Sequence, residues 1–164
     1  MNIKFLIQYI MHPRTTGAIL PSSKRLSKKM IKEINFDKCN CIIELGPGTG
    51  VFTEEILKRR NVNTKVILIE YNREFYKLLK SKYDNIEKIY IINDSAENID
   101  CYIKKYSMGN VDYIVSGLLF ASLPSDMSED ILDKSKSILG DKGRQIKKRL
   151  RQFRISIEYS KKNC

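Results

Sequence analysis

The sequence has few metal-ligating residues and no long apolar run. It contains one histidine, His12, and four cysteines, none of which forms a Cys-x-x-Cys pair: Cys39, Cys41, Cys101 and Cys164. Zinc sites typically combine such pairs with histidines, so we predict reduced thiols and no metal site. No apolar run reaches the roughly eighteen residues that span a bilayer. The N-terminal residues 1–11 are interrupted by polar side chains and lack the small-residue cleavage site of a signal peptide. These absences favour a globular, cytoplasmic protein of one domain.

Acidic residues are scarce relative to basic ones. The 30 Lys and Arg against 19 Asp and Glu give a formal net charge of +11. Residues 141–164 hold nine basic and two acidic side chains, a net +7, so the first 140 residues carry 11 − 7 = +4. Such a charge favours anionic partners, either nucleic acid or an anionic lipid surface, but it also serves solubility alone.

Four short apolar runs predict β-strands, at residues 41–45, 66–70, 89–93 and 111–115. Each run is nearly continuous rather than alternating, which is typical of parallel strands covered on both faces. If Cys39 and Cys41 share a strand, their side chains point to opposite faces.

Helical spacing of apolar residues separates these strands. It is found at residues 53–58 and 72–80, where Asn72 is a suitable N-cap, and helices are also expected at 21–34 and about 126–138. The alternation predicts an α/β fold with a doubly wound, mostly parallel sheet. In such sheets ligands bind at the carboxyl ends of the strands.

A glycine-dense turn follows the first predicted strand. The motif is Glu44-Leu-Gly-Pro-Gly-Thr-Gly50, and Glu70 closes the next strand. Gly46, Gly48 and Gly50 can adopt backbone angles barred to other residues and let a ligand lie against the main chain. Glu70 is placed to accept hydrogen bonds from ribose hydroxyls, and Glu44 can pair with a cationic ligand group. The G-x-G-x-G spacing differs from the nicotinamide fingerprint, so we predict a nucleotide-type cofactor that need not be a dinucleotide.

These residues resemble the cofactor motif of class I methyltransferases that use S-adenosylmethionine, with Glu70 as the ribose-binding acid. Residues 21–26, Pro-Ser-Ser-Lys-Arg-Leu, and 116–124, Ser-Gly-Leu-Leu-Phe-Ala-Ser-Leu-Pro, resemble the phospholipid N-methyltransferase branch, which is similar to the rRNA adenine dimethyltransferases. The resemblance covers residues 1–143. It implies a Rossmann-like domain that binds S-adenosylmethionine, with an N-terminal helical segment at 1–38.

The other candidate site residues also follow strands. Tyr71 is expected to stack on the adenine or to be a partly buried surface aromatic. Asp94 is expected to accept a hydrogen bond from the adenine amino group, or instead to cap a helix or form a turn. The expected cofactor-binding residues are Glu44, Gly46, Gly48, Gly50, Glu70, Tyr71, Asp94 and Ser95. The resemblance implies that Ser116, Gly117 and Leu118 orient the methyl acceptor.

The sequence departs from the family pattern at two places. Leu119 stands where a proline is expected, and the basic tail 144–164 replaces the aromatic-rich strands that should follow. One interpretation of the tail is a basic amphipathic helix suited to an anionic membrane. The other, which we favour, is a truncated or frameshifted C-terminus. A sheet lacking its last strands leaves the fourth strand with an unpaired edge. This predicts either a homo-oligomer through that edge or an aggregation-prone monomer, with low or absent activity.

Three functions are consistent with the sequence. The first is N-methylation of a phospholipid headgroup amine such as phosphatidylethanolamine, with peripheral association at the membrane. The second is N6-methylation of adenine in ribosomal RNA, against which Ser116 and Gly117 replace the asparagine of those relatives. The third is cofactor binding without catalysis. No residue is identified as a general base.

Overall fold

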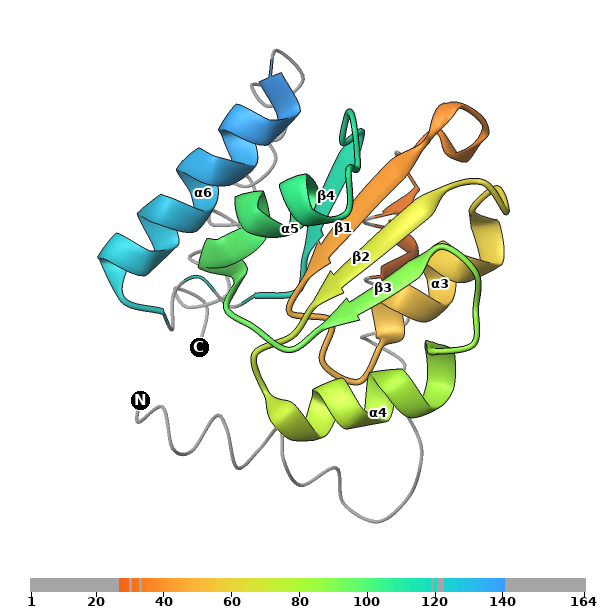
Figure 1. The fold of residues 1–164 in the computed structure, drawn as a ribbon, viewed down its shortest axis with the longest axis horizontal. Coiled ribbons are helices and arrows are strands. Elements are labelled where there is room, and N and C mark those ends of the chain that lie inside the picture. Colours follow the sequence, from red (N-terminus) through yellow and green to blue (C-terminus); the bar gives the residue numbers. More distant parts are fainter. Residues whose placement is uncertain (1–26, 30, 33, 119, 121–122, 141–164) are drawn as a thin grey trace, which may run out of the picture.

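The computed structural model describes residues 27–29, 31–32, 34–118, 120 and 123–140 (Figure 1). The motif at 21–26, Leu119 and the basic tail 144–164 lie outside the described residues. Predictions about these segments therefore remain predictions.

The sheet has four parallel strands in the order β3-β2-β1-β4. They are β1 (Cys41–Leu45), β2 (Lys65–Ile69), β3 (Ile89–Ile92) and β4 (Tyr113–Ser116). All four predicted strands are confirmed, although β2 lies one residue earlier than predicted and β4 begins two residues later. Just before β4, the Asp112 carboxylate accepts hydrogen bonds from the backbone N–H groups of Asn40 (2.7 Å) and Cys41 (3.1 Å), which are distant in sequence.

Helices cover both faces of the sheet (Figure 1). The described elements are η1 (Phe36–Lys38), α3 (Val51–Arg59), α4 (Arg73–Tyr83), η2 (Ala96–Asn98), α5 (Ile99–Lys105) and α6 (Ser125–Leu139). Asn72 is the N-cap of α4, as predicted, and its side chain accepts from the backbone N–H groups of Glu74 and Phe75. This arrangement confirms a doubly wound α/β fold.

Two apolar cores lie on opposite faces of the sheet. Alternate strand residues such as Ile43 and Ile67 pack with Ile131 of α6, whereas Ile42 packs on the other face with Leu79 of α4. The predicted N-terminal helix is confirmed in part, since residues 27–29 and 31 are helical and Ile31 and Ile34 belong to the second core.

The three described cysteines form no disulfide with one another. Cys39 and Cys41 are buried in opposite cores, and Cys101 is exposed. Burial raises the pKa of the Cys41 thiol to about 11, so it stays protonated at neutral pH. In the described ranges no cluster of three or more His, Cys, Asp or Glu side chains is arranged to hold a metal ion.

Strands β3 and β4 are the two edges of the sheet that the described residues form. The unpaired side of the fourth strand is therefore an edge in this part of the chain, and association of subunits through it stays a prediction. No helix among the described residues has the length and apolar character needed to cross a membrane.

Candidate active site

The glycine-rich turn joins β1 to α3 at the carboxyl edge of the sheet. Gly46, Gly48 and Gly50 have positive φ values of 65°, 57° and 87°. A Cβ atom on Gly46 would lie 2.5 Å from Leu118 Cδ2, and one on Gly50 would lie 3.1 Å from the Tyr83 hydroxyl. A Cβ atom on Gly48 would meet nothing within 4 Å. Packing within the protein therefore restricts two of the glycines, whereas the third borders open space in which a ligand can lie.

Glu70 follows β2 directly and ties the glycine-rich turn to the next loop. Its Oε2 accepts a hydrogen bond from the backbone N–H of Gly48, and its Oε1 accepts one from the backbone N–H of Asn72, both at 2.8 Å. A carboxylate offers about four acceptor positions, so two remain for donors such as ribose hydroxyls. Glu70 is 6% exposed, and these two bonds fix its orientation in advance of a ligand.

Glu44 is fully buried, and only one of its two carboxylate oxygens has a hydrogen-bond partner among the described residues. The Thr53 hydroxyl of α3 donates to Glu44 Oε2 at 2.7 Å, while no described residue forms a hydrogen bond with Oε1. Burial raises the pKa of Glu44 to about 8, and the nearby Glu70 adds to this, against the opposing effect of the Thr53 hydrogen bond. A buried carboxylate oxygen without a partner is costly. The site therefore suits a cationic ligand group, as the sequence predicts.

Tyr71 is held beside the end of β3 with its side chain in the open. Asn93 donates from Nδ2 to the carbonyl oxygens of Glu70 (2.8 Å) and Tyr71 (3.0 Å), which joins the loops after β2 and β3. Tyr71 is 80% exposed, so it is not the partly buried aromatic of the alternative interpretation. An exposed ring at the carboxyl edge of the sheet is available to stack on a base.

Asp94 belongs to a hydrogen-bonded cluster after β3. Its Oδ1 accepts from the backbone N–H of Ser95 at 2.7 Å, and its Oδ2 accepts from Asn98 Nδ2 at 3.0 Å and from the Tyr102 hydroxyl at 2.6 Å. The Tyr102 hydrogen bond is the main reason that the pKa of Asp94 is lowered, and it raises the pKa of Tyr102 to about 12. Asp94 therefore has the turn-forming role that is the alternative to ligand binding. Its three hydrogen bonds still leave acceptor capacity on Oδ1.

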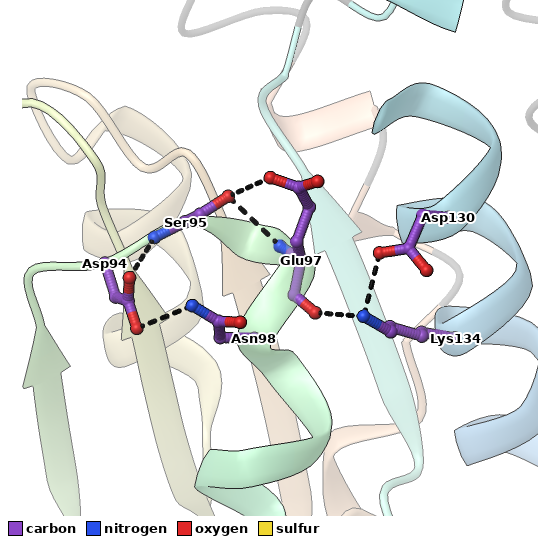
Figure 2. Close-up of polar contacts among 6 residues, drawn as sticks. All are labelled: Asp94, Ser95, Glu97, Asn98, Asp130 and Lys134. Atoms are coloured by element: carbon purple, nitrogen blue, oxygen red, sulfur yellow. Dashed lines mark hydrogen bonds and ion pairs between the residues drawn. The ribbon is translucent and has the colours of Figure 1, made fainter. Parts of the chain in front are cut away.

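Ser95 connects this cluster to α6. It is the N-cap of η2, its hydroxyl donates to Glu97 Oε2 at 2.8 Å, and it accepts from the backbone N–H of Glu97. Lys134 of α6 donates to the carbonyl oxygen of Glu97 at 2.7 Å and pairs with Asp130 at 2.8 Å. Figure 2 shows this continuous series of contacts from the loop after β3 to α6. Ser95 therefore has structural partners, and its predicted contact with the cofactor remains a prediction.

The predicted acceptor loop packs against the glycine-rich turn. Ser116 ends β4, and its hydroxyl accepts from the backbone N–H of Leu118 at 3.2 Å. The backbone N–H of Gly117 donates to the Leu45 carbonyl oxygen at 2.8 Å. A Cβ atom on Gly117 would lie 2.5 Å from the Gly46 carbonyl oxygen, which only a glycine avoids. The candidate acceptor and cofactor segments are therefore in direct contact.

Several residues that support the site were missed from the sequence. Thr53, Asn93, Asn98 and Tyr102 hold the predicted carboxylates and loops in place. Thr53 could have been found as a polar residue on the buried side of a helix that begins at the glycine-rich turn. The others depend on contacts between loops that the sequence pattern does not encode.

Comparison with known proteins identifies the family. The model of the family described as ribosomal RNA adenine dimethylase matches residues 17–150. The chain belongs to this family. It is therefore a member of a group of S-adenosylmethionine-dependent methyltransferases, as the glycine-rich turn and Glu70 predict. The open space at Gly48, the free acceptor positions of Glu70 and the unpartnered Glu44 Oε1 all fit that cofactor.

The relatives of this dimethylase-family chain differ in substrate. It is 26% identical to an ornithine lipid N-methyltransferase of Singulisphaera acidiphila, over 85% of the chain and 72% of that protein. It is 32% identical to the ribosomal RNA small subunit methyltransferase A of Mycoplasma capricolum, over 70% of the chain but only 44% of that protein. The CcbJ methyltransferase of Streptomyces caelestis has a similar fold, with a TM-score of 0.55 and 16% identity over 78% of the chain and 52% of that structure. This likeness supports the fold alone.

Proposed function

We propose that the chain transfers the methyl group of S-adenosylmethionine to the amine nitrogen of a lipid headgroup, such as that of phosphatidylethanolamine. The observation that carries the proposal is the direct contact of the Ser116–Gly117–Leu118 segment with the glycine-rich turn. It puts a small, serine-containing acceptor segment beside the cofactor loop. The ornithine lipid relative, which the chain matches over 72% of its length, supports a lipid amine as the substrate class.

Different residues at the carboxyl edge of the sheet would bind different parts of the cofactor. In the bound state, Glu70 would accept hydrogen bonds from the ribose hydroxyls, Tyr71 would stack on the base, and Glu44 would pair with the cationic part of S-adenosylmethionine. Gly48 leaves the space that the ligand occupies. When bound, S-adenosylmethionine supplies an electrophilic methyl group, so the protein has mainly to position the acceptor and exclude water.

Acceptor binding requires a neutral amine whose lone pair is directed at the methyl group. The Ser116 hydroxyl already accepts one hydrogen bond from the Leu118 N–H, and it retains capacity to accept another from the amine. This contact orients the nitrogen without removing a proton. We assign no general base, and the amine enters the site in its neutral form.

Methylation of ribosomal RNA adenine is the second candidate function. The family model and the net charge of +11 favour it, because basic proteins bind the phosphate backbone. Against it, Ser116 and Gly117 occupy the place of the asparagine that grips the adenine amino group in the RNA methyltransferases that the sequence resembles. We therefore place the lipid amine first, with the protein acting at the cytoplasmic surface of an anionic membrane.

A labelled methyl-transfer experiment separates these functions. The full chain is incubated with radiolabelled S-adenosylmethionine and with three acceptors in parallel: vesicles containing phosphatidylethanolamine, vesicles containing ornithine lipid, and ribosomal RNA. Label in either lipid supports the proposal, and label in RNA alone contradicts it. Calorimetric binding of S-adenosylmethionine without transfer to any of the three supports cofactor binding without catalysis. The Glu70→Ala variant serves as the negative control for cofactor-dependent transfer.

A further inference from the structure

The hydrogen bonds of Asp94 use up all but one of its acceptor positions. An ionised carboxylate has about two acceptor positions on each oxygen. Both positions on Oδ2 are taken, by Asn98 Nδ2 at 3.0 Å and by the Tyr102 hydroxyl at 2.6 Å. The Ser95 N–H takes one position on Oδ1 at 2.7 Å. Among the contacts of the described residues, one position therefore remains, and it is on Oδ1.

Asp94 lies where a base would meet it. It follows β3 at the same carboxyl edge as Glu70 and Tyr71, and Asn93, its neighbour in sequence, is hydrogen bonded to the backbone of both. Asp94 is partly exposed, so its remaining acceptor position is open to a ligand.

We propose that Tyr102 and Asn98 are positioning residues that occupy the Oδ2 edge of Asp94 and leave a single acceptor on Oδ1 for the 6-amino group of adenine. The inference rests on the proposed function, because it assumes that the ligand is S-adenosylmethionine or its product. It adds two residues of η2 and α5 to the site, neither of which needs to touch the ligand.

This arrangement makes the site selective between purines. The three donors stabilise the ionised form of Asp94, so the carboxylate has no proton of its own to donate. It accepts from an amino group, but it repels the 6-oxo group of hypoxanthine, which is also an acceptor. Sites that hydrogen bond one group disfavour an analogue that carries an acceptor in its place, because the carboxylate then faces a second acceptor with no proton between them.

The test compares S-adenosylhomocysteine with S-inosylhomocysteine, which differs from it by the oxo group at the 6-position. Affinities are measured by calorimetry on the full chain and on Tyr102→Phe, with Asn98→Ala as a second variant. Tyr106→Phe is the matched control. The ring of Tyr106 stacks on Tyr102 at 6.4 Å, but none of the Asp94 hydrogen bonds involves it. Thermal unfolding of each variant confirms that it is folded.

We expect the unaltered chain to prefer S-adenosylhomocysteine by on the order of tenfold or more. Tyr102→Phe should reduce this preference by roughly three- to tenfold, mainly through weaker binding of the amino ligand, because Asp94 loses its strongest orienting partner. Asn98→Ala should act in the same direction, and Tyr106→Phe should leave the preference unchanged. When Asp94 is replaced by alanine, adding Tyr102→Phe should not change the preference for S-adenosylhomocysteine any further.

Different failures have different meanings. If the unaltered chain does not bind S-adenosylhomocysteine, the proposed function fails. If it binds but does not distinguish the two ligands, or if Tyr102→Phe weakens both equally, the positioning role is wrong and Tyr102 has only a structural role.

Discussion

Replacing Glu44 by glutamine should make the stability of the protein less dependent on pH. The folded chain raises the pKa of this buried carboxyl from its ordinary value of 4.5 to about 8, chiefly through burial. Between these two values the folded chain holds a proton that the unfolded chain has released. The stability that this group contributes is therefore fully present below pH 4.5 and is lost as the pH rises toward 8. Glu44→Gln removes this dependence and keeps the shape of the side chain.

The size of the effect follows from the same two pKa values. One proton is linked to folding over most of the range from pH 5 to pH 7, so the unaltered chain should lose on the order of 2 to 3 kcal/mol relative to Glu44→Gln. Burying the glutamine amide of Glu44→Gln has a cost of its own, because the described residues around Oε1 offer no hydrogen-bond partner. This cost is the same at both pH values, so it cancels when the change in stability between them is compared.

Urea unfolding of both proteins at pH 5, 6 and 7 measures this difference directly. A ligand experiment provides an independent test. At pH 7 a carboxyl with a pKa of about 8 is mostly protonated, so binding of a cation at Oε1 should release most of a proton. Calorimetry with S-adenosylmethionine in buffers of different ionisation enthalpy counts that proton. The unaltered chain and Glu44→Gln are compared in both experiments. If their stabilities depend equally on pH, or if they release the same number of protons when S-adenosylmethionine binds, Glu44 is ionised without a ligand.

Three further substitutions test the cofactor loop and its neighbours. Gly48→Val should abolish binding of S-adenosylmethionine in calorimetry while the fold is largely kept, since its side chain would enter open space at a φ of 57°; retained affinity would contradict the assignment of the loop. Glu70→Ala should weaken binding by roughly 1 to 3 kcal/mol through lost hydrogen bonds to the ribose, and an unchanged titration would return Glu70 to a purely structural role. Tyr71→Trp places a single tryptophan in a chain that has none, and its fluorescence should change on addition of S-adenosylhomocysteine if the ring stacks on the base.

The fold was largely predictable because its signals are local. Continuous apolar runs marked the strands, and Asn72 marked the beginning of α4 through its capping side chain. The positions of Glu70 and of the glycine-rich turn followed from the rule that loops at the carboxyl ends of parallel strands share one edge. The predicted start of β4 is two residues too early. Asp112, just before the strand, binds the backbone N–H groups of Asn40 and Cys41, and these contacts across 72 and 71 residues leave no local signal in the sequence.

The supporting contacts of the site could not be predicted in the same way. The sequence predicts that Asp94 either has a local structural role or binds a ligand. In the structure it accepts three local hydrogen bonds, and these leave one acceptor position for a ligand. The sequence places Tyr102 eight residues away on a short helix, with no pattern that points to Asp94. Such pairings depend on loop geometry, which apolar periodicity does not report.

The close contact of Gly117 with the Gly46 carbonyl oxygen bears on how the substrate range of such a protein can change. The two loops meet backbone to backbone, so neither can be exchanged or lengthened at this point without displacing the other. A chimera that takes its acceptor loop from a relative should therefore keep the methyl-donor site only if both glycines are retained. Changes of acceptor specificity are then confined to side chains outside this contact, because the backbones of the two loops can change only together.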